Sequence, residues 1–191
     1  MTDRRLVGVA AVFAVFLTAC DQLFHVRTDT LVYHWGPQVW DQTVIVPVTF
    51  FLAAVGMLDV SRRTRPEALH PVAVWRVAAS LAAVTAAYLL SGLLDPELAA
   101  TYAALLLVLW VVRLGLRRER PVAVAAGLLI AVGGVLGESA LSALGEFDYV
   151  SPDVIGVPWW LFPLYLHGAL TAADVVALVR SRATTAALRA G

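Results

Sequence analysis

The stretch LAATYAALLLVLWVVRLGLRRER, residues 98–120, shows what kind of fold this chain adopts. Residues 98–112 carry no charged side chain, and arginines follow at positions 113, 117, 118 and 120. A helix needs about 20 apolar residues, or roughly 17 at the short end, to cross the hydrocarbon of a bilayer. The run reaches this length if the helix starts at Pro96, because proline suits a first helical turn. We therefore predict a membrane-spanning helix that ends at an arginine-rich loop.

Further apolar stretches lie on both sides of this one. The predicted spans are Leu6–Phe24, Thr43–Leu58, Val72–Leu94, Leu98–Val112, Pro121–Leu144 and Trp159–Val179. The second is short, and its helix can begin earlier, near Val39. Only Asp95-Pro96-Glu97 separates the third from the fourth, which predicts a tight helical hairpin. The predicted fold class is therefore an all-α integral membrane protein with six transmembrane helices.

The composition agrees with a membrane protein. Of the 191 residues, 60% are hydrophobic and 15% are charged, and the mean hydropathy is +0.80. A soluble domain carries about 25% charged residues, so this chain needs the bilayer as part of its solvent. We expect one six-helix domain over residues 1–191, with a short cytoplasmic tail at residues 180–191. The net charge is zero and there is no basic stripe, which argues against nucleic-acid binding.

The arginines predict the orientation of the helices. They gather at the N-terminus, in the second and fourth loops and in the tail: Arg4, Arg5, Arg62, Arg63, Arg65, Arg113, Arg117, Arg118, Arg120, Arg180, Arg182 and Arg189. The other loops hold only Arg27 and are otherwise acidic. Arginine-rich loops stay in the cytoplasm, so both termini are predicted to be cytoplasmic. The abundance of Ala, Val, Leu and Arg, without lysine, is typical of a GC-rich bacterium, whose plasma membrane is the expected location.

The N-terminal segment also allows another interpretation. Arg4-Arg5, an apolar run and then Leu17-Thr18-Ala19-Cys20 resemble a bacterial lipoprotein signal, in which the cysteine is lipidated after cleavage. The apolar run continues past Cys20 to Phe24, which favours a retained first helix. Processing at Cys20 stays open, because the arginine pattern would be the same.

Aromatic residues flank the predicted outer loops. They are Tyr33, Trp35, Trp40, Tyr149, Trp159 and Trp160. Such rings favour the headgroup layer of a bilayer, so we interpret most of them as interfacial anchors.

Polar residues inside the spans are the candidate functional residues. An ionisable group there costs about 3 kcal/mol and usually faces the protein interior. Asp21 and Gln22 lie near the outer end of the first span, and Glu138 lies deeper, after a run of glycines. In the last span, residues 167, 171 and 174 (His, Thr and Asp) form one polar stripe. These groups predict either interhelical hydrogen bonds or the polar end of a lipid-lined cavity.

Evidence for catalysis is weak in the sequence. Gly137-Glu138-Ser139-Ala140-Leu141 begins like a nucleophile elbow but ends in leucine and lies within a predicted helix. The histidines, His25, His34, His70 and His167, show no metal-ligand spacing, so we predict no metal and no cofactor. A lipid-modifying enzyme that uses Glu138, His167 or Asp174 remains the alternative. A transporter is less supported, because the chain shows no internal repeat.

The last outer loop and final span resemble a known family. Phe147-Asp148-Tyr149-Val150-Ser151-Pro152-Asp153 is followed by Val157, Trp160-Leu161, Gly168, Thr171 and Asp174. This pattern is similar to the Insig (insulin-induced gene) family, which has a Tyr-x-Ser-Pro-Asp signature and commonly asparagine at the position of Asp174. Weaker similarities are Leu98, Thr101, Ala103-Ala104-Leu105, Leu109-Trp110, Val46-Pro47, Ala53-Ala54-Val55-Gly56 and Arg76.

The resemblance implies a six-helix sensor of neutral membrane lipids that is not an enzyme. Eukaryotic members bind oxysterols and, through them, the escort protein Scap and HMG-CoA reductase. The family's sterol-contacting positions fall on Leu81, Glu97 and Trp110, with glutamine in the family where Glu97 stands. Scap recognition depends on an aspartate that corresponds here to Leu114. The resemblance therefore gives no support for a Scap-type partner.

The expected ligand is a neutral lipid with one or two hydroxyls, either diacylglycerol-like or sterol-like. A phospholipid head would need a cation in the cavity, and no arginine lies deep in a predicted span. The glycine-rich fifth span also predicts a homo-oligomer. The candidate lipid-binding residues are Asp21, Gln22, Leu81, Glu97, Thr101, Trp110, Glu138, Trp160, His167, Thr171 and Asp174.

Overall fold

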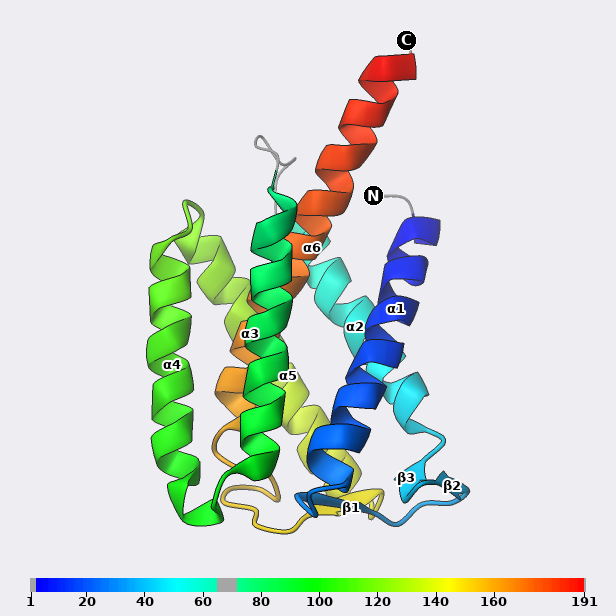
Figure 1. The fold of residues 1–191 in the computed structure, drawn as a ribbon, viewed down its shortest axis with the longest axis vertical. Coiled ribbons are helices and arrows are strands. Elements are labelled where there is room, and N and C mark those ends of the chain that lie inside the picture. Colours follow the sequence, from blue (N-terminus) through cyan, green and yellow to red (C-terminus); the bar gives the residue numbers. More distant parts are fainter. Residues whose placement is uncertain (1–2, 65–71, 191) are drawn as a thin grey trace.

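The computed structural model describes residues 3–64 and 72–190, so Arg65 and His70 lie outside it. Within these ranges the long helices are α1 (Asp3–Asp21), α2 (Val46–Thr64), α3 (Val74–Leu93), α4 (Ala99–Gly115), α5 (Arg120–Ala143) and α6 (Leu161–Ala190). A π-helix, η1 (Gln22–Val26), continues α1, and a 3-10 turn, η2 (Pro96–Leu98), precedes α4. Figure 1 shows both termini at one end of the bundle and the short strands at the other. The prediction of an all-α, six-helix membrane fold is confirmed, and its orientation in the membrane stays a prediction.

Five of these helices are long and apolar enough to cross a membrane. They are the segments Arg4–Val26, Val74–Leu93, Pro96–Gly115, Arg120–Ala143 and Leu161–Arg182. The helix α2 is the exception, because Asp59, Arg62 and Arg63 lie in its last turns. Asp59 pairs with Arg62 at 2.6 Å and with Arg63 at 2.5 Å, at the three- and four-residue spacings that bring side chains together on a helix. These pairs extend α2 beyond its predicted end at Leu58.

The start of α2 also differs from the prediction. Strand β2 (Gln38–Val39) pairs with β3 (Gln42–Thr43) in an antiparallel hairpin, so a helix near Val39 is wrong. Trp40 and Asp41 form the turn with φ of 52° and 65°, as a two-residue hairpin requires at both central positions. The backbone groups of this segment bond across the hairpin, and the helix begins only at Val46.

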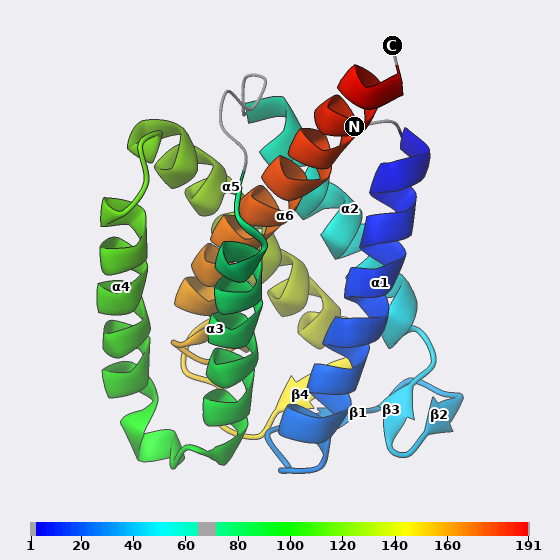
Figure 2. The ribbon, with the colours of Figure 1, turned by 45° about the horizontal axis from the view of Figure 1, so that its top comes forward.

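The helix α6 forms the centre of the bundle. Of its apolar segment 72% is buried, compared with 22–28% of the other spanning segments. It contacts α2, α3, α4 and α5, and Figure 2 shows it passing between them. The outer helices expose apolar side chains such as Val12, Leu105 and Leu129. This distribution is expected where lipid is the solvent, because an apolar side chain then gains nothing from leaving the surface.

A small sheet closes the end of the bundle opposite the termini. Strand β1 (Leu31–Tyr33) pairs with β4 (Phe147–Tyr149), with Leu31 opposite Tyr149 and Tyr33 opposite Phe147. The ring of Phe147 packs edge-on against Tyr33 at 5.8 Å and Tyr149 at 5.7 Å. The sheet therefore joins the loop after η1 to the loop after α5, and it brings two tyrosines to the site described next.

Candidate functional site

A partly open cavity of about 560 Å³ lies between α2 and α5, at the end of the bundle closed by β1 and β4. This volume lies within the range of ligand pockets, about 300–1,000 Å³. Its apolar wall includes Phe50, Ala53, Met57 and Ile130. Glycines also line it, at positions 56, 133, 134 and 137.

The glycines of α5 have two different roles. A Cβ atom on Gly133 or Gly137 would meet no heavy atom within 4 Å, so these glycines leave space open. A Cβ atom on Gly134 would lie 2.5 Å from the ring of Tyr165 on α6. Gly134 is therefore the position that lets α5 and α6 approach and admits the tyrosine ring.

Glu138 on α5 forms the first polar group of the cavity. Its carboxylate accepts a hydrogen bond from Tyr165 at 2.6 Å and another from Tyr149 at 2.5 Å. Burial, and then the charge of Glu138, raise the pKa of Tyr149 well above its ordinary value, so Tyr149 stays a hydroxyl donor. Tyr149 is thus a buried partner of a membrane carboxylate, and its interpretation as an interfacial anchor is wrong.

Asp21, at the end of α1, forms the second polar group. Its Oδ2 accepts hydrogen bonds from Tyr33 and Gln42, each at 2.8 Å. Its Oδ1 lies 3.4 Å from Nδ1 of His25. Asp21 is only 3% exposed, so these donors replace the water that its carboxylate loses on burial.

The π-helix η1 directs His25 into this region. A π-helix commonly marks a functional position, because its extra residue re-aims the side chains. Nε2 of His25 lies 2.9 Å from Oγ of Ser91 on α3. Its ring stacks on Tyr88 at 4.8 Å and contacts Trp160 at 5.3 Å. His25 therefore joins α1, α3 and the start of α6 at the polar end of the cavity.

Glu146 is the third carboxyl group of the cavity wall. It is 1% exposed, and its Oε2 has no hydrogen-bond partner among the described residues. Burial raises the pKa of this carboxyl group above its ordinary value, because the charged form loses its hydration. A neutral carboxyl group can both donate and accept a hydrogen bond.

A second, narrower space of about 60 Å³ adjoins the cavity. The two share Phe50, Ala53, Met57, Tyr88, Glu138 and Tyr165 in their walls. The narrower one extends between α1, α3 and α6, along Phe13, Leu81, Val84 and Thr171. Together they form an apolar space with two branches that adjoin at the buried polar groups.

The structure places the predicted site residues in several different settings. Asp21 and Glu138 line the larger cavity, and Leu81 and Thr171 line the narrower one. Trp160 is buried behind His25, and Gln22 donates to the carbonyl of Trp40. Glu97 and Thr101 are exposed, whereas Trp110 is buried with Ala123, Ala131, Leu166 and Leu170. His167 and Asp174 lie in an arginine cluster near the opposite end of the bundle.

The arginine cluster comprises Arg76, Arg113 and Arg117 around Asp174. Arg117 donates to Asp174 at 2.6 Å, and Nε of Arg76 lies 3.3 Å from the same carboxylate. Arg113 donates to Nδ1 of His167 at 2.6 Å. The polar stripe of α6 therefore forms interhelical bonds, and Arg113 reaches further into the bundle than the sequence suggested.

The geometry does not assemble the predicted catalytic alternative. No hydrogen bond or ion pair joins Glu138 to His167 or Asp174 among the residues described. One set of contacts resembles a serine–histidine–aspartate triad, because the ring of His25 contacts Ser91 through one nitrogen and Asp21 through the other. However, Ser91 is not part of the cavity wall, and its hydroxyl also donates to the carbonyl of Tyr88 at 2.9 Å. This arrangement joins the end of α1 and η1 to α3.

Sequence reasoning missed several residues of the cavity. They are His25, Tyr33, Tyr88, Glu146, Tyr149 and Tyr165. The four-residue spacing of Asp21 and His25 was a visible signal, because such residues share a helix face. Tyr33, Tyr149 and Tyr165 gave no such signal, since their carboxylate partners lie on other elements.

Solved structures of one mycobacterial protein resemble this chain. A cross-linked MvINS trimer matches with a TM-score of 0.75 and 28% identity, over 93% of this chain and 95% of that chain. A mycobacterial Insig homologue, MvINS from Mycobacterium vanbaalenii, matches with a TM-score of 0.74 and 27% identity, over 88% of this chain and 92% of that chain. No protein-family model and no curated protein matches the chain. The resemblance to the Insig family is confirmed, and the fold is that of a multi-pass membrane Insig homologue.

Proposed function

From this likeness to an Insig homologue, we propose that the protein binds a neutral lipid in the cavity between α2 and α5 and acts as a lipid sensor without catalysis. The observation that carries the proposal is an apolar cavity of about 560 Å³ with buried carboxyl and tyrosine groups at one end. A lipid hydroxyl would bond to these groups, and its hydrocarbon would extend along the apolar wall of the larger cavity.

The charge of the cavity wall supports a neutral ligand. Three carboxyl groups line it, those of Asp21, Glu138 and Glu146, and its described wall contains no arginine. A phosphate group would meet like charge there and would lose its hydration without a cation to replace it. A hydroxyl can donate to a carboxylate, and it can both donate to and accept from a protonated carboxyl group.

The shape of the space favours diacylglycerol over a sterol. A diacylglycerol has one free hydroxyl at the junction of two acyl chains. The two spaces adjoin at Glu138 and Tyr165, so the hydroxyl would lie at these groups, with one chain along the larger cavity and only the first methylenes of the other in the space of about 60 Å³. A rigid sterol would occupy only the larger branch. Diacylglycerol is also available in bacterial membranes.

Mass spectrometry of co-purified lipids tests the proposal. The protein is purified in mild detergent, and its lipids are extracted, identified and quantified. We expect a stoichiometric neutral lipid in the wild type and much less in Gly137→Leu, because Gly137 lines the cavity and faces open space. Gly8→Leu is the matched control, because Gly8 is exposed on α1 and its Cβ would also meet nothing. A neutral lipid retained equally by both variants, or only anionic phospholipid in the wild type, would contradict the proposal.

Self-association belongs to the same proposal. The homologue MvINS was crystallised as a cross-linked trimer. The exposed apolar faces of α4 and α5 give this chain a surface for a second copy within the bilayer. Sedimentation velocity in detergent would test it, and a strictly monomeric mass at micromolar concentration would contradict it.

A further inference from the structure

We propose that the arginine cluster at the terminal end of the bundle binds the phosphate of an anionic phospholipid. The site comprises Arg76 on α3 and Arg113 on α4, with Arg117 behind them. It is separate from the cavity and does not depend on the lipid proposed to bind there.

Two guanidinium groups contact one carboxylate in this cluster, and a third reaches it through a serine hydroxyl. Arg117 donates to Oδ2 of Asp174 at 2.6 Å, and Nε of Arg76 lies 3.3 Å from Oδ1. Ser80 on α3 donates to the same carboxylate at 2.7 Å and accepts from Arg113 at 2.9 Å. Asp174 is 1% exposed, so this network lies mostly inside the protein.

His167 contributes no negative charge to balance Arg113. Its Nε2 lies 2.9 Å from the carbonyl oxygen of Leu106, so Nε2 must carry the proton that it donates. Its Nδ1 therefore accepts from Arg113 at 2.6 Å, and the imidazole is neutral. Within residues 3–64 and 72–190, Arg113 forms no ion pair with a carboxylate. These five groups thus carry three positive charges and one negative charge.

An anion with several acceptor oxygens would balance this excess. A partly buried charge that has hydrogen bonds but no counterion is unfavourable, because neutral acceptors replace only part of its hydration. The planar fork of arginine matches the geometry of phosphate oxygens, and two adjacent arginines can share one phosphate. Basic pockets between transmembrane helices bind anionic lipid heads by this chemistry.

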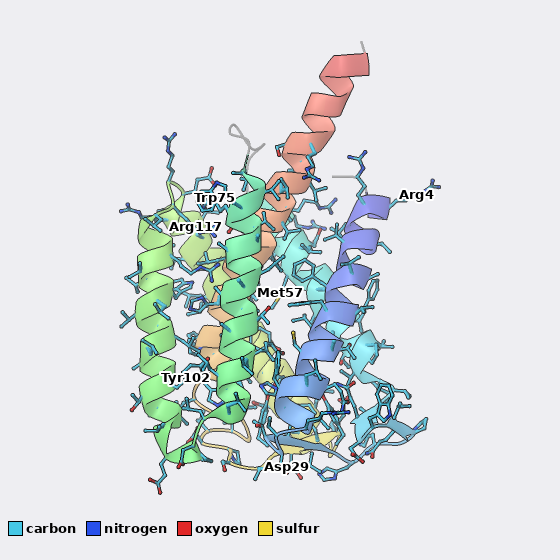
Figure 3. All side chains as sticks on the ribbon, viewed as in Figure 1. Arg4, Asp29, Met57, Trp75, Tyr102 and Arg117 are labelled. Atoms are coloured by element: carbon cyan, nitrogen blue, oxygen red, sulfur yellow. The ribbon has the colours of Figure 1, made fainter. Side chains whose placement is uncertain are left out.

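The position of the cluster indicates a lipid as the source of the phosphate. The side chain of Arg76 is 39% exposed, and the adjacent Trp75 is 73% exposed. Exposed tryptophans favour the headgroup layer of a bilayer. Figure 3 shows Trp75 and Arg117 at the same end of the molecule, between the upper parts of α3 and α4. The open guanidinium of Arg76 therefore lies at the depth of lipid phosphates.

Native mass spectrometry in a neutral detergent tests this site. The purified protein is titrated with phosphatidylglycerol, with phosphatidylcholine and with inorganic phosphate. We expect phosphatidylglycerol to bind preferentially. The double substitution Arg76→Gln, Arg113→Gln should weaken that binding about tenfold or more. Arg4→Gln, Arg5→Gln is the matched control, because it removes two exposed arginines at the same end of the bundle and should change the affinity little.

Two further variants keep the test decisive if the double variant does not fold. Arg76→Gln alone changes a part-exposed side chain and should still weaken binding. Arg113→Lys keeps the positive charge but loses the planar guanidinium group. Its affinity for phosphatidylglycerol should lie between those of the wild type and the double variant. Equal binding of the two lipids, or unchanged phosphatidylglycerol binding in the Arg76 and Arg113 variants, would overturn the proposal. Displacement by millimolar inorganic phosphate would assign the site to a free anion and overturn the lipid assignment. The neutral lipid of the cavity should be retained in all these variants, which separates this test from that of the proposed function.

Discussion

The contact between Gly134 and Tyr165 gives the sharpest test of how α5 and α6 pack around the cavity. In Gly134→Ala the new Cβ would lie 2.5 Å from the tyrosine ring, well inside van der Waals contact. The ring can move away only by giving up the 2.6 Å hydrogen bond from its hydroxyl to Glu138. We therefore expect both a loss of stability and a disturbance of the polar end of the cavity.

The size of the effect follows from three contributions. Overpacking a tight contact costs about 1–3 kcal/mol. Loss of a hydrogen bond to a charged group costs a further ~1.5–3 kcal/mol. The higher helix propensity of alanine offsets about 1 kcal/mol of this loss. The expected net loss is therefore about 1.5–5 kcal/mol, and Tm should fall by about 2–4 °C for each kcal/mol in a chain of this length.

The adjacent glycine supplies the control for this experiment. A Cβ on Gly133 would meet nothing within 4 Å, so Gly133→Ala should be neutral or slightly stabilising. The assay is thermal unfolding of the two variants and the wild type in the same detergent, with quantification of retained neutral lipid. If Gly134→Ala were as stable as Gly133→Ala and retained as much lipid, the described packing of Tyr165 would be refuted.

Two further predictions concern buried carboxyl groups. Asp174→Asn should lower the free energy of unfolding by about 3–5 kcal/mol, because it leaves the paired arginines without their carboxylate. Unfolding in detergent would measure this loss, and a change below about 1 kcal/mol would contradict the ion-pair network. Burial raises the pKa of Glu146 in the folded protein, so the folded state holds its proton to higher pH than the unfolded state, whose pKa is about 4.3. Stability should therefore fall as the pH rises from about 4.3 to the raised pKa of the folded state. Glu146→Gln should remove this contribution to the slope of Tm against pH. Parallel slopes in the wild type and Glu146→Gln would show that Glu146 is not the cause.

The membrane fold could be predicted from the sequence because long apolar runs have few alternatives in lipid. Each backbone N–H and C=O group in hydrocarbon must bond within the segment, which makes the segment helical. The prediction failed where the segment was short and flanked by polar residues. At Val39 a two-residue turn formed a hairpin, and at Asp59 two ion pairs extended the helix beyond Leu58.

The candidate site was predictable only in part. Asp21 and Glu138 were notable as ionisable groups in predicted spans, and both line the cavity. His167 and Asp174 were notable for the same reason, yet they bond to arginines that the sequence assigned to a loop region. Long arginine side chains reach back along a helix from the membrane surface, so a residue counted in a loop can bond within the bundle.

The sequence by itself determined that the solvent of this chain is a bilayer, that the chain crosses it as helices, and that one loop and the last helix resemble the Insig family. These properties depend on local composition and short motifs, which the order of residues contains. Only the tertiary structure decided which polar groups face a common cavity and which form a cluster with arginines. A helical pattern defines a face of each helix, but the rotation and approach of its neighbours decide what that face contacts. Glu138 meets Tyr149 and Tyr165 because a glycine lets two helices approach, and this depends on packing between residues distant in the sequence.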